Sequence, residues 1–159
     1  MLNRRNFLGG IATLSALPVF DALGQTATDV PIVFVHGNGD QAPIWLTTLW
    51  RFESNGYRRD RLHAVNFTDP MARDDDGVAQ PNRSSTEDQL RELTTAIDRT
   101  RERTSAPRVA LVGLSRGGNT IRNYVSAPDR AANVSHVVLG GTPNHGAFSF
   151  EANLGNEFN

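Results

Sequence analysis

The stretch Arg108-Val-Ala-Leu-Val-Gly-Leu-Ser-Arg-Gly-Gly118 decides the fold of this chain. Its first part, residues 108–112, is mostly apolar and suits a strand that is buried on both faces. Residues 116–126 follow with apolar side chains at helical spacing, which predicts a helix. The segment Gly113-Leu114-Ser115-Arg116-Gly117 is therefore a turn that joins a strand to a helix.

This turn matches the pattern Gly-x-Ser-x-Gly. Positions two before and two after the serine approach each other closely, and only glycine avoids a clash there, which explains Gly113 and Gly117. We expect Ser115 to adopt a strained backbone conformation above the helix N-terminus, whose N–H groups favour an anionic intermediate. Strand, turn and helix together form the context of a nucleophile elbow, so Ser115 is the candidate nucleophile. The alternative is a structural Gly-Ser turn.

A second motif, His36-Gly37-Asn38-Gly39-Asp40, follows an earlier apolar run. Acyl transfer needs two N–H donors aimed at the developing oxyanion, one after the nucleophile and one from an earlier strand-to-helix loop. We assign these donors to the backbone amides of Arg116 and Asn38. His36 is interpreted as a structural hydrogen-bonding residue rather than the catalytic base.

The composition excludes several other classes. The chain has 159 residues, a net charge of −1 and 38% hydrophobic residues, so we expect one globular domain without a general basic surface for nucleic acid. The absence of cysteine excludes a disulfide scaffold, a thiolate metal site and a cysteine nucleophile. All 16 basic residues are arginine, so residues 36–40 are not a Walker loop, and Ala42 replaces the third glycine of a dinucleotide fingerprint. No metal or cofactor is expected, and Asp74-Asp75-Asp76-Gly77 is interpreted as a solvated acidic loop rather than a calcium loop.

Residues 1–24 are typical of an export signal. Arg4 and Arg5 form a basic start, a mildly apolar stretch follows, and Ala22-Leu23-Gly24 offers a cleavage site. The segment is too short and too interrupted for a membrane span. Arg4-Arg5-Asn6-Phe7-Leu8 resembles the twin-arginine export motif, the alternative being an ordinary basic start. We predict a protein that is exported to the periplasm or beyond the cell, with residues 25–159 as its domain.

Strands alternate with helices along residues 25–159. Apolar runs predict strands at residues 31–36, 62–67, 108–112 and 134–139. Helices are predicted at residues 43–55, with Leu46, Leu49 and Phe52 at three-residue spacing, after a capping box at Ser84-Ser85-Thr86-Glu87, and at residues 116–126. Residues 68–83 are polar and predict a loop. This alternation is typical of an α/β fold with a parallel sheet covered by helices on both faces.

Together the two motifs resemble the α/β-hydrolase superfamily and, more narrowly, its class 2 lipases. Pro31-Ile-Val-Phe-Val-His-Gly37 is similar to the oxyanion-loop strand of those enzymes, and Gly140-Gly-Thr-Pro-Asn-His-Gly146 to the loop after their sixth strand. Residues 36–40 are also similar to extracellular polyhydroxybutyrate depolymerases. The resemblance covers residues 31–147 and implies that the four strands are the third to sixth of the family. It departs from many lipases at Leu114 and Arg116, where the guanidinium is expected to form a surface ion pair or, alternatively, to favour an anionic substrate group.

The catalytic triad is incomplete in this sequence. The family order is serine, then an acid, then histidine. After Ser115 we find Asp129 at the wrong end of the sheet and His136 inside a strand, whereas His145 is a weak candidate for the base. We therefore expect an N-terminal fragment of a longer enzyme, without the family's seventh and eighth strands.

Three functions remain open. The first is an exported serine esterase or lipase acting on small-molecule or lipid esters, with the twin-arginine machinery as export partner. The second is a polyester depolymerase with the same machinery. The third is a non-catalytic binding protein that retains the hydrolase fold.

Overall fold

A four-stranded parallel sheet forms the centre of the molecule. The computed structural model describes residues 30–144. Strands β1 (Ile32–Val35), β2 (Leu62–Ala64), β5 (Val109–Leu114) and β6 (Val134–Gly140) lie in the order β2-β1-β5-β6. All three pairings are parallel, so the predicted sheet is confirmed, although β2 is shorter than expected. Short connections such as η2 (Arg59–Arg61) lead into the strands.

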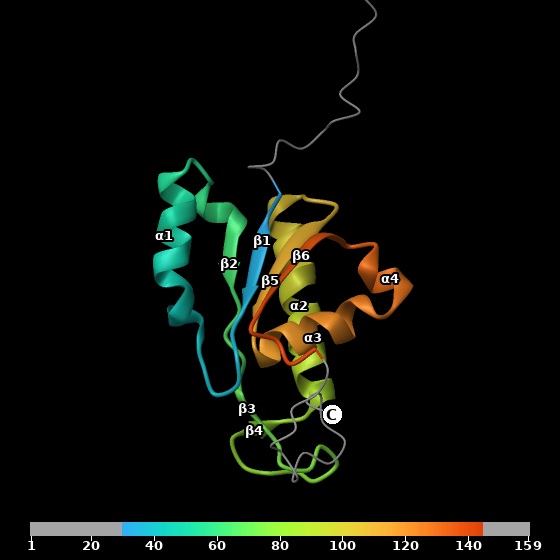
Figure 1. Ribbon diagram of the computed structural model, residues 1–159. Coiled ribbons are helices and arrows are strands. Elements are labelled where there is room, and N and C mark those ends of the chain that lie inside the picture. Colours follow the sequence, from blue (N-terminus) through green and yellow to red (C-terminus); the bar gives the residue numbers. More distant parts are fainter. Residues whose placement is uncertain (1–29, 145–159) are drawn as a thin grey trace, which may run out of the picture.

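Helices cover both faces of this sheet, as predicted (Figure 1). Helix α1 (Leu46–Ser54), which continues from the 3-10 turn η1 (Ala42–Trp45), packs on one face. Helices α2 (Thr86–Thr104) and α3 (Arg116–Val125) pack on the other, and α4 (Pro128–Ala131) follows α3.

Alternation along β1 divides the core into two clusters. Val33 and Val35 point toward α2 and α3, whereas Ile32 and Phe34 point toward α1. Each of the four side chains is buried, because a central parallel strand has no solvent-exposed face. The run of apolar residues at 32–35 thus binds the two helical layers to one strand.

Helix α1 begins later than predicted. The three apolar residues at three-residue spacing differ in burial: Leu49 is buried and Phe52 half-buried, but Leu46 is exposed. A 3-10 turn has about three residues per turn rather than 3.6, so it shifts which side chains face the sheet. Gly56 follows the helix with φ +86°, the left-handed conformation expected after its end.

Helix α2 has its capping box one residue later than predicted. Ser85, not Ser84, is the N-cap: its hydroxyl accepts from the Asp88 amide, and the Asp88 carboxylate accepts from the Ser85 amide. These bonds and the nearby Arg91 guanidinium lower the pKa of Asp88 to about 2. Asp88 is therefore charged at neutral and mildly acidic pH. Ser84 is free to enter a strand.

The segment predicted as a loop contains a small second sheet. Strands β3 (Met71–Ala72) and β4 (Arg83–Ser84) pair in parallel within residues 68–84. Strands of two residues have no detectable alternation, and this pair depends on the contacts of the loop with the rest of the fold. The correction matters because β3 and β4 lie beside the candidate site.

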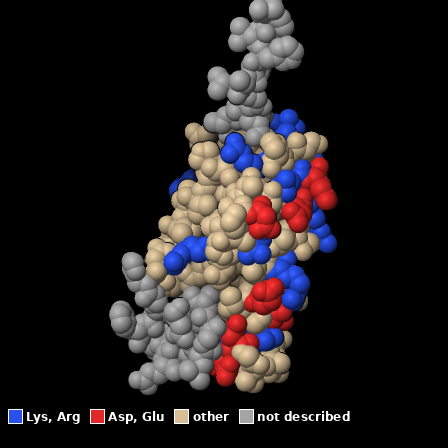
Figure 2. Space-filling view, turned by 90° about the vertical axis from the view of Figure 1, so that its right-hand side faces the viewer, with Lys and Arg blue, Asp and Glu red and all other residues tan. Residues whose placement is uncertain are grey.

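Strand β6 is at the edge of the described sheet. Val137 and Val138 are exposed on it, with 59% of Val138 accessible to solvent. In Figure 2 the acidic side chains of the face shown lie toward its right-hand side among basic ones, whereas further basic side chains lie on the left among uncharged residues. Within residues 30–144, no helix is long and apolar enough to cross a membrane.

We expect Phe34→Ala to destabilise the protein by about 3–5 kcal/mol, the usual loss for a buried phenylalanine. The Phe34 ring is fully buried, 5.3 Å from the Trp45 ring centroid and 5.7 Å from that of Phe52. Urea unfolding measures the free energy of unfolding. The control Trp50→Ala removes a side chain that is 62% exposed and should change stability by less than about 0.5 kcal/mol. Equal losses for both variants would contradict the core assignment.

Candidate functional site

Ser115 lies in the sharp turn between β5 and α3. Its backbone has φ +52° and ψ −124°, a conformation that non-glycine residues rarely adopt. Its amide donates to the Gly140 carbonyl of β6, at 2.9 Å, and its carbonyl accepts from the Gly118 amide, also at 2.9 Å. The turn is thus held by hydrogen bonds on both sides of the serine, and its strain is stored where function is expected.

The glycines of the turn permit very close backbone contacts. A Cβ atom on Gly117 would collide with the carbonyl oxygens of Val35 and His36. One on Gly113 would lie 2.7 Å from Ile121 Cδ1 and 2.9 Å from the Gly118 backbone. Real Cβ atoms do not make such contacts. Helix α3 therefore begins in direct contact with the end of β1, and only glycine fits at position 117.

The sheet brings the two sequence motifs to the same edge. Val35 lies opposite Gly113, so β1 and β5 end side by side. A Cβ atom on Gly37 would be 3.1 Å from Ser115 Cβ and 3.4 Å from the Leu114 carbonyl oxygen. Asn38 therefore follows a residue that packs directly against Ser115. No hydrogen bond joins the Asn38 amide to another residue within 30–144.

His36 is a structural residue in this geometry, as interpreted from the sequence. Its buried ring bonds through Nδ1 to the Gly37 carbonyl at 2.9 Å and accepts through Nε2 from the Phe67 amide at 3.4 Å. Burial lowers the pKa of His36, and the positive charge of Arg116 acts in the same direction, against the Gly37 carbonyl and Asp40. A neutral ring with its proton on Nδ1 satisfies both bonds. Both ring nitrogens are thus engaged, which leaves neither to serve as a base for Ser115.

The Arg116 side chain is not where the sequence placed it. Neither a surface ion pair nor a guanidinium at the pocket edge is correct, because the residue is 0% exposed. Its guanidinium donates to the Pro70 carbonyl (3.2 Å), to Ser84 Oγ (3.1 Å) and to the Ser84 carbonyl (2.9 Å). Buried charges require such hydrogen bonds, and the segment at 70–84 provides them.

The Asn38 side chain contacts the same segment. Its Oδ1 atom accepts from the Ala72 amide at 2.6 Å, and the neighbouring Gly39 amide donates to the Pro70 carbonyl at 3.1 Å. These side-chain roles of Asn38 and Arg116 were missed from the sequence. No local sequence pattern indicates them, because the bonds join residues that are 32 to 46 positions apart.

The remaining triad candidates do not join this site within the described residues. Ser115 directly precedes the N-terminus of α3. Asp129 lies in α4, beyond the C-terminus of α3, and is therefore at the other end of that helix. His136 is exposed in β6, four residues before Gly140, which is about 13 Å of strand. His145 and the predicted export signal at residues 1–24 lie outside the described residues.

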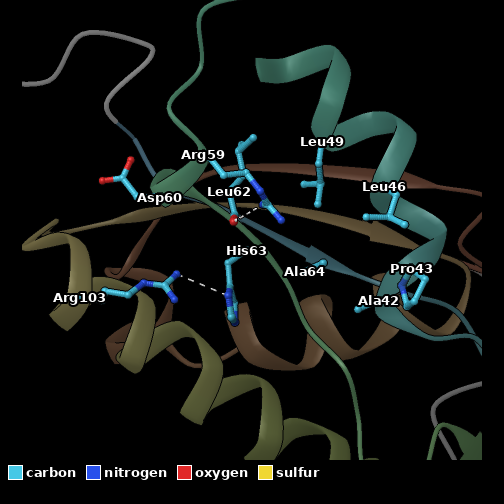
Figure 3. A pocket seen from close by; sticks show the side chains of 10 residues that line it. All are labelled: Ala42, Pro43, Leu46, Leu49, Arg59, Asp60, Leu62, His63, Ala64 and Arg103. Carbon is cyan, nitrogen blue, oxygen red and sulfur yellow. Dashed lines mark hydrogen bonds between the residues drawn. The ribbon is translucent and has the colours of Figure 1, made fainter. Parts of the chain in front are cut away.

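A hollow of about 500 Å³ lies elsewhere, along the outer edge of β2 (Figure 3). Leu46 and Leu49 of α1 line one side, and Arg103 of α2 donates to His63 Nδ1 at 3.5 Å on the other. Neither Ser115 nor either candidate oxyanion donor lines it. This hollow is therefore not where the candidate nucleophile would meet a substrate.

The acidic segment at residues 74–76 is largely engaged in hydrogen bonds. Asp74 pairs with Arg83 at 2.9 Å, Asp75 accepts from the Gly77 amide and Asp76 from the Thr86 amide. Among residues 30–144, no group of three or more His, Cys, Asp or Glu side chains is arranged to hold a metal ion.

A family model and two solved structures that resemble this chain all belong to lipases. Residues 29–147 match the family Lipase (class 2). The mature form of the lipase BlEst2 from Bacillus licheniformis has a similar structure, with a TM-score of 0.56 at 22% identity over 77% of this chain and 44% of that one. Its propeptide form gives a TM-score of 0.55 at 22% identity, over 76% of this chain and 24% of that one. This chain thus spans less than half the length of these relatives. No curated protein sequence matches it.

We expect Gly117→Ala to prevent the elbow from forming, because its methyl group would overlap the carbonyls at the end of β1. The thermal midpoint should fall by 10 °C or more, equivalent to at least about 2 kcal/mol in a domain of this size. Gly77→Ala is the control, since its new methyl group would meet only Asp75 Oδ1, at 3.4 Å. Similar midpoints for the two variants would show that α3 can move away from β1.

The buried neutral state of His36 predicts acid sensitivity. Its folded pKa lies below the ordinary 6.5, so the unfolded chain binds a proton first as the pH falls. Stability should therefore be full above pH 6.5 and decline from there down to the folded pKa. The Cε1 proton of His36, followed by NMR against pH, should titrate below 6.5 with the ring nitrogens showing the Nδ1–H tautomer. Titration at or above 6.5 would contradict the assignment.

Proposed function

Because this chain belongs to the class 2 lipase family, we propose that it is the nucleophile-bearing part of an exported carboxylic ester hydrolase with Ser115 as its nucleophile. The family and the fold support an ester hydrolase in general. The roles of individual residues and the export are our proposals.

One observation carries the assignment of Ser115. Its positive φ places it at a strained elbow, and Gly37 packs against its Cβ at the joint end of β1 and β5. A structural serine turn does not require this strain or a second glycine-rich loop in contact with it. Strain kept at the meeting point of two loops is typical of catalytic sites.

The reaction would proceed by acyl transfer. Ser115 Oγ attacks the ester carbonyl carbon while a general base takes its proton, and the carbonyl oxygen becomes an oxyanion. The Asn38 and Arg116 amides donate to that oxygen. Collapse of the intermediate expels the alcohol, which receives the proton, and water then hydrolyses the acyl-enzyme through a second oxyanion. We propose that the base is supplied from outside residues 30–144, as His36 is already engaged.

The substrate class follows from this chemistry. The machinery acts on carboxylic esters of small molecules or lipids and needs no metal or cofactor, because the serine and amide donors supply the nucleophile and the charge stabilisation. Residues 1–24 support export, since their paired arginines and apolar stretch match a twin-arginine-type signal.

We expect Ser115→Ala in the complete natural polypeptide to abolish hydrolysis of p-nitrophenyl butyrate, with a loss of at least about 10⁴-fold in kcat. The wild type should react covalently with a fluorophosphonate probe and the variant should not. Ser126→Ala, at the far end of α3, is the control and should retain full activity and labelling. A wild type that neither labels nor hydrolyses esters would favour a binding protein on the hydrolase fold.

A further inference from the structure

We propose that residues 70–84 form a brace that holds the two oxyanion-hole amides at their working separation. Asn38 and Arg116 are then positioning residues through their side chains, in addition to donating through their backbones. This inference rests on the proposed function. It assigns a catalytic purpose to a segment that the sequence presents only as a polar loop.

The brace contacts the first donor loop at two points. Ala72 donates its amide to Asn38 Oδ1 at 2.6 Å, and the Pro70 carbonyl accepts from the Gly39 amide at 3.1 Å. One bond is made by the Asn38 side chain and the other by the N–H of the peptide that links residues 38 and 39. They therefore restrict rotation of the loop that carries the Asn38 amide.

The brace contacts the second donor through the buried guanidinium. Arg116 donates to the Pro70 carbonyl, to Ser84 Oγ and to the Ser84 carbonyl, all within 3.2 Å. Pro70 is thus shared: one carbonyl oxygen accepts from the Arg116 side chain and from the Gly39 amide. This single oxygen therefore links the Arg116 side chain to Gly39, the residue that follows Asn38.

The brace is also fixed internally and to the rest of the fold. The Arg73 amide donates to the Ser84 carbonyl, and the Arg83 guanidinium donates to the Ala72 carbonyl at 2.7 Å, so β3 and β4 are bound to each other. Arg73 forms an ion pair with Asp88 of α2 at 3.0 Å. Because the pKa of Asp88 is lowered to about 2, the carboxylate of this ion pair is charged at neutral pH.

Oxyanion stabilisation depends steeply on such positioning. Losing one donor costs about 10²–10³ in kcat, and a displacement of 1 Å can cost about 10². Side-chain substitution at positions 38 and 116 leaves both backbone N–H groups in place. An effect of Asn38→Ala on kcat therefore reports on the orientation of these groups, whereas Arg116→Met also removes a buried positive charge, for which Arg116→Lys is the control.

The test compares Arg116→Met, Asn38→Ala and the double variant in the complete natural polypeptide, with p-nitrophenyl butyrate as substrate. Methionine keeps the length of the side chain but donates no hydrogen bond. We expect kcat to fall about 10- to 100-fold in each single variant with KM changed less than about threefold, since the oxyanion forms only after binding. The fall in kcat of the double variant should be smaller than the product of the two single-variant factors, because one brace positions both residues.

A transition-state analogue gives an independent readout. The Ki of a trifluoromethyl ketone, whose adduct carries an oxyanion, should rise in proportion to the loss of kcat/KM. Arg116→Lys keeps a charged hydrogen-bond donor, so its kcat/KM and its Ki for the analogue should lie between those of the wild type and Arg116→Met. The control Arg130→Met removes a guanidinium that likewise binds two backbone carbonyls, those of Tyr124 and Asn123, and should leave kcat and Ki unchanged.

Circular dichroism at the assay temperature separates folding from positioning. Folded Arg116→Met and Asn38→Ala variants with wild-type kcat and Ki would overturn the brace, even with lowered thermal midpoints. If Arg116→Met does not fold, Asn38→Ala decides, because the Asn38 side chain is exposed. A wild type that hydrolyses no ester would contradict both the proposed function and the role of the brace. If only the role of the brace is wrong, Ser115→Ala still abolishes hydrolysis while Asn38→Ala and Arg116→Met keep the wild-type kcat.

Discussion

The direct contact between the start of α3 and the end of β1 is the constraint on which the structure depends. Gly117 lies against the carbonyls of Val35 and His36 with no room for a side chain. This contact forces the turn after β5 to be so tight that Ser115 takes a positive φ. It also places the loop after β1 against the serine, so one close packing of backbones creates both halves of the candidate site.

A buried guanidinium stabilises the surroundings of that contact. Removing Arg116 from water is unfavourable unless its donors are satisfied, and carbonyl oxygens of the 70–84 segment satisfy them. The arginine therefore orders a segment that has little apolar surface of its own. Burial lowers the pKa of His36 and so favours the neutral ring between Gly37 and Phe67, and the charge of Arg116 acts in the same direction.

Elements with long apolar runs were predictable, and elements that depend on a few polar contacts were not. Residues 31–36 and 108–112 were identified as strands because burial on both faces requires unbroken apolar sequence. The N-cap of α2 was misplaced by one residue because serine is a good N-cap residue at either position 84 or 85. Ser84 is excluded as the N-cap only because it pairs in β4. The start of α1 was placed too early because the 3-10 turn η1 occupies the first residues of the predicted helix.

The sequence by itself determined the order of strands and helices, the family resemblance and the identity of Ser115 as candidate nucleophile. Glycine spacing around a serine, between an apolar run and a helical pattern, is a local signal and needs no knowledge of distant residues. The tertiary structure decided that Gly37 meets Ser115, that the Arg116 side chain is buried, and that the Pro70 carbonyl accepts from both Arg116 and Gly39. These facts depend on hydrogen bonds and packing between segments that only the folded sheet brings together, and such contacts have no periodicity along the chain.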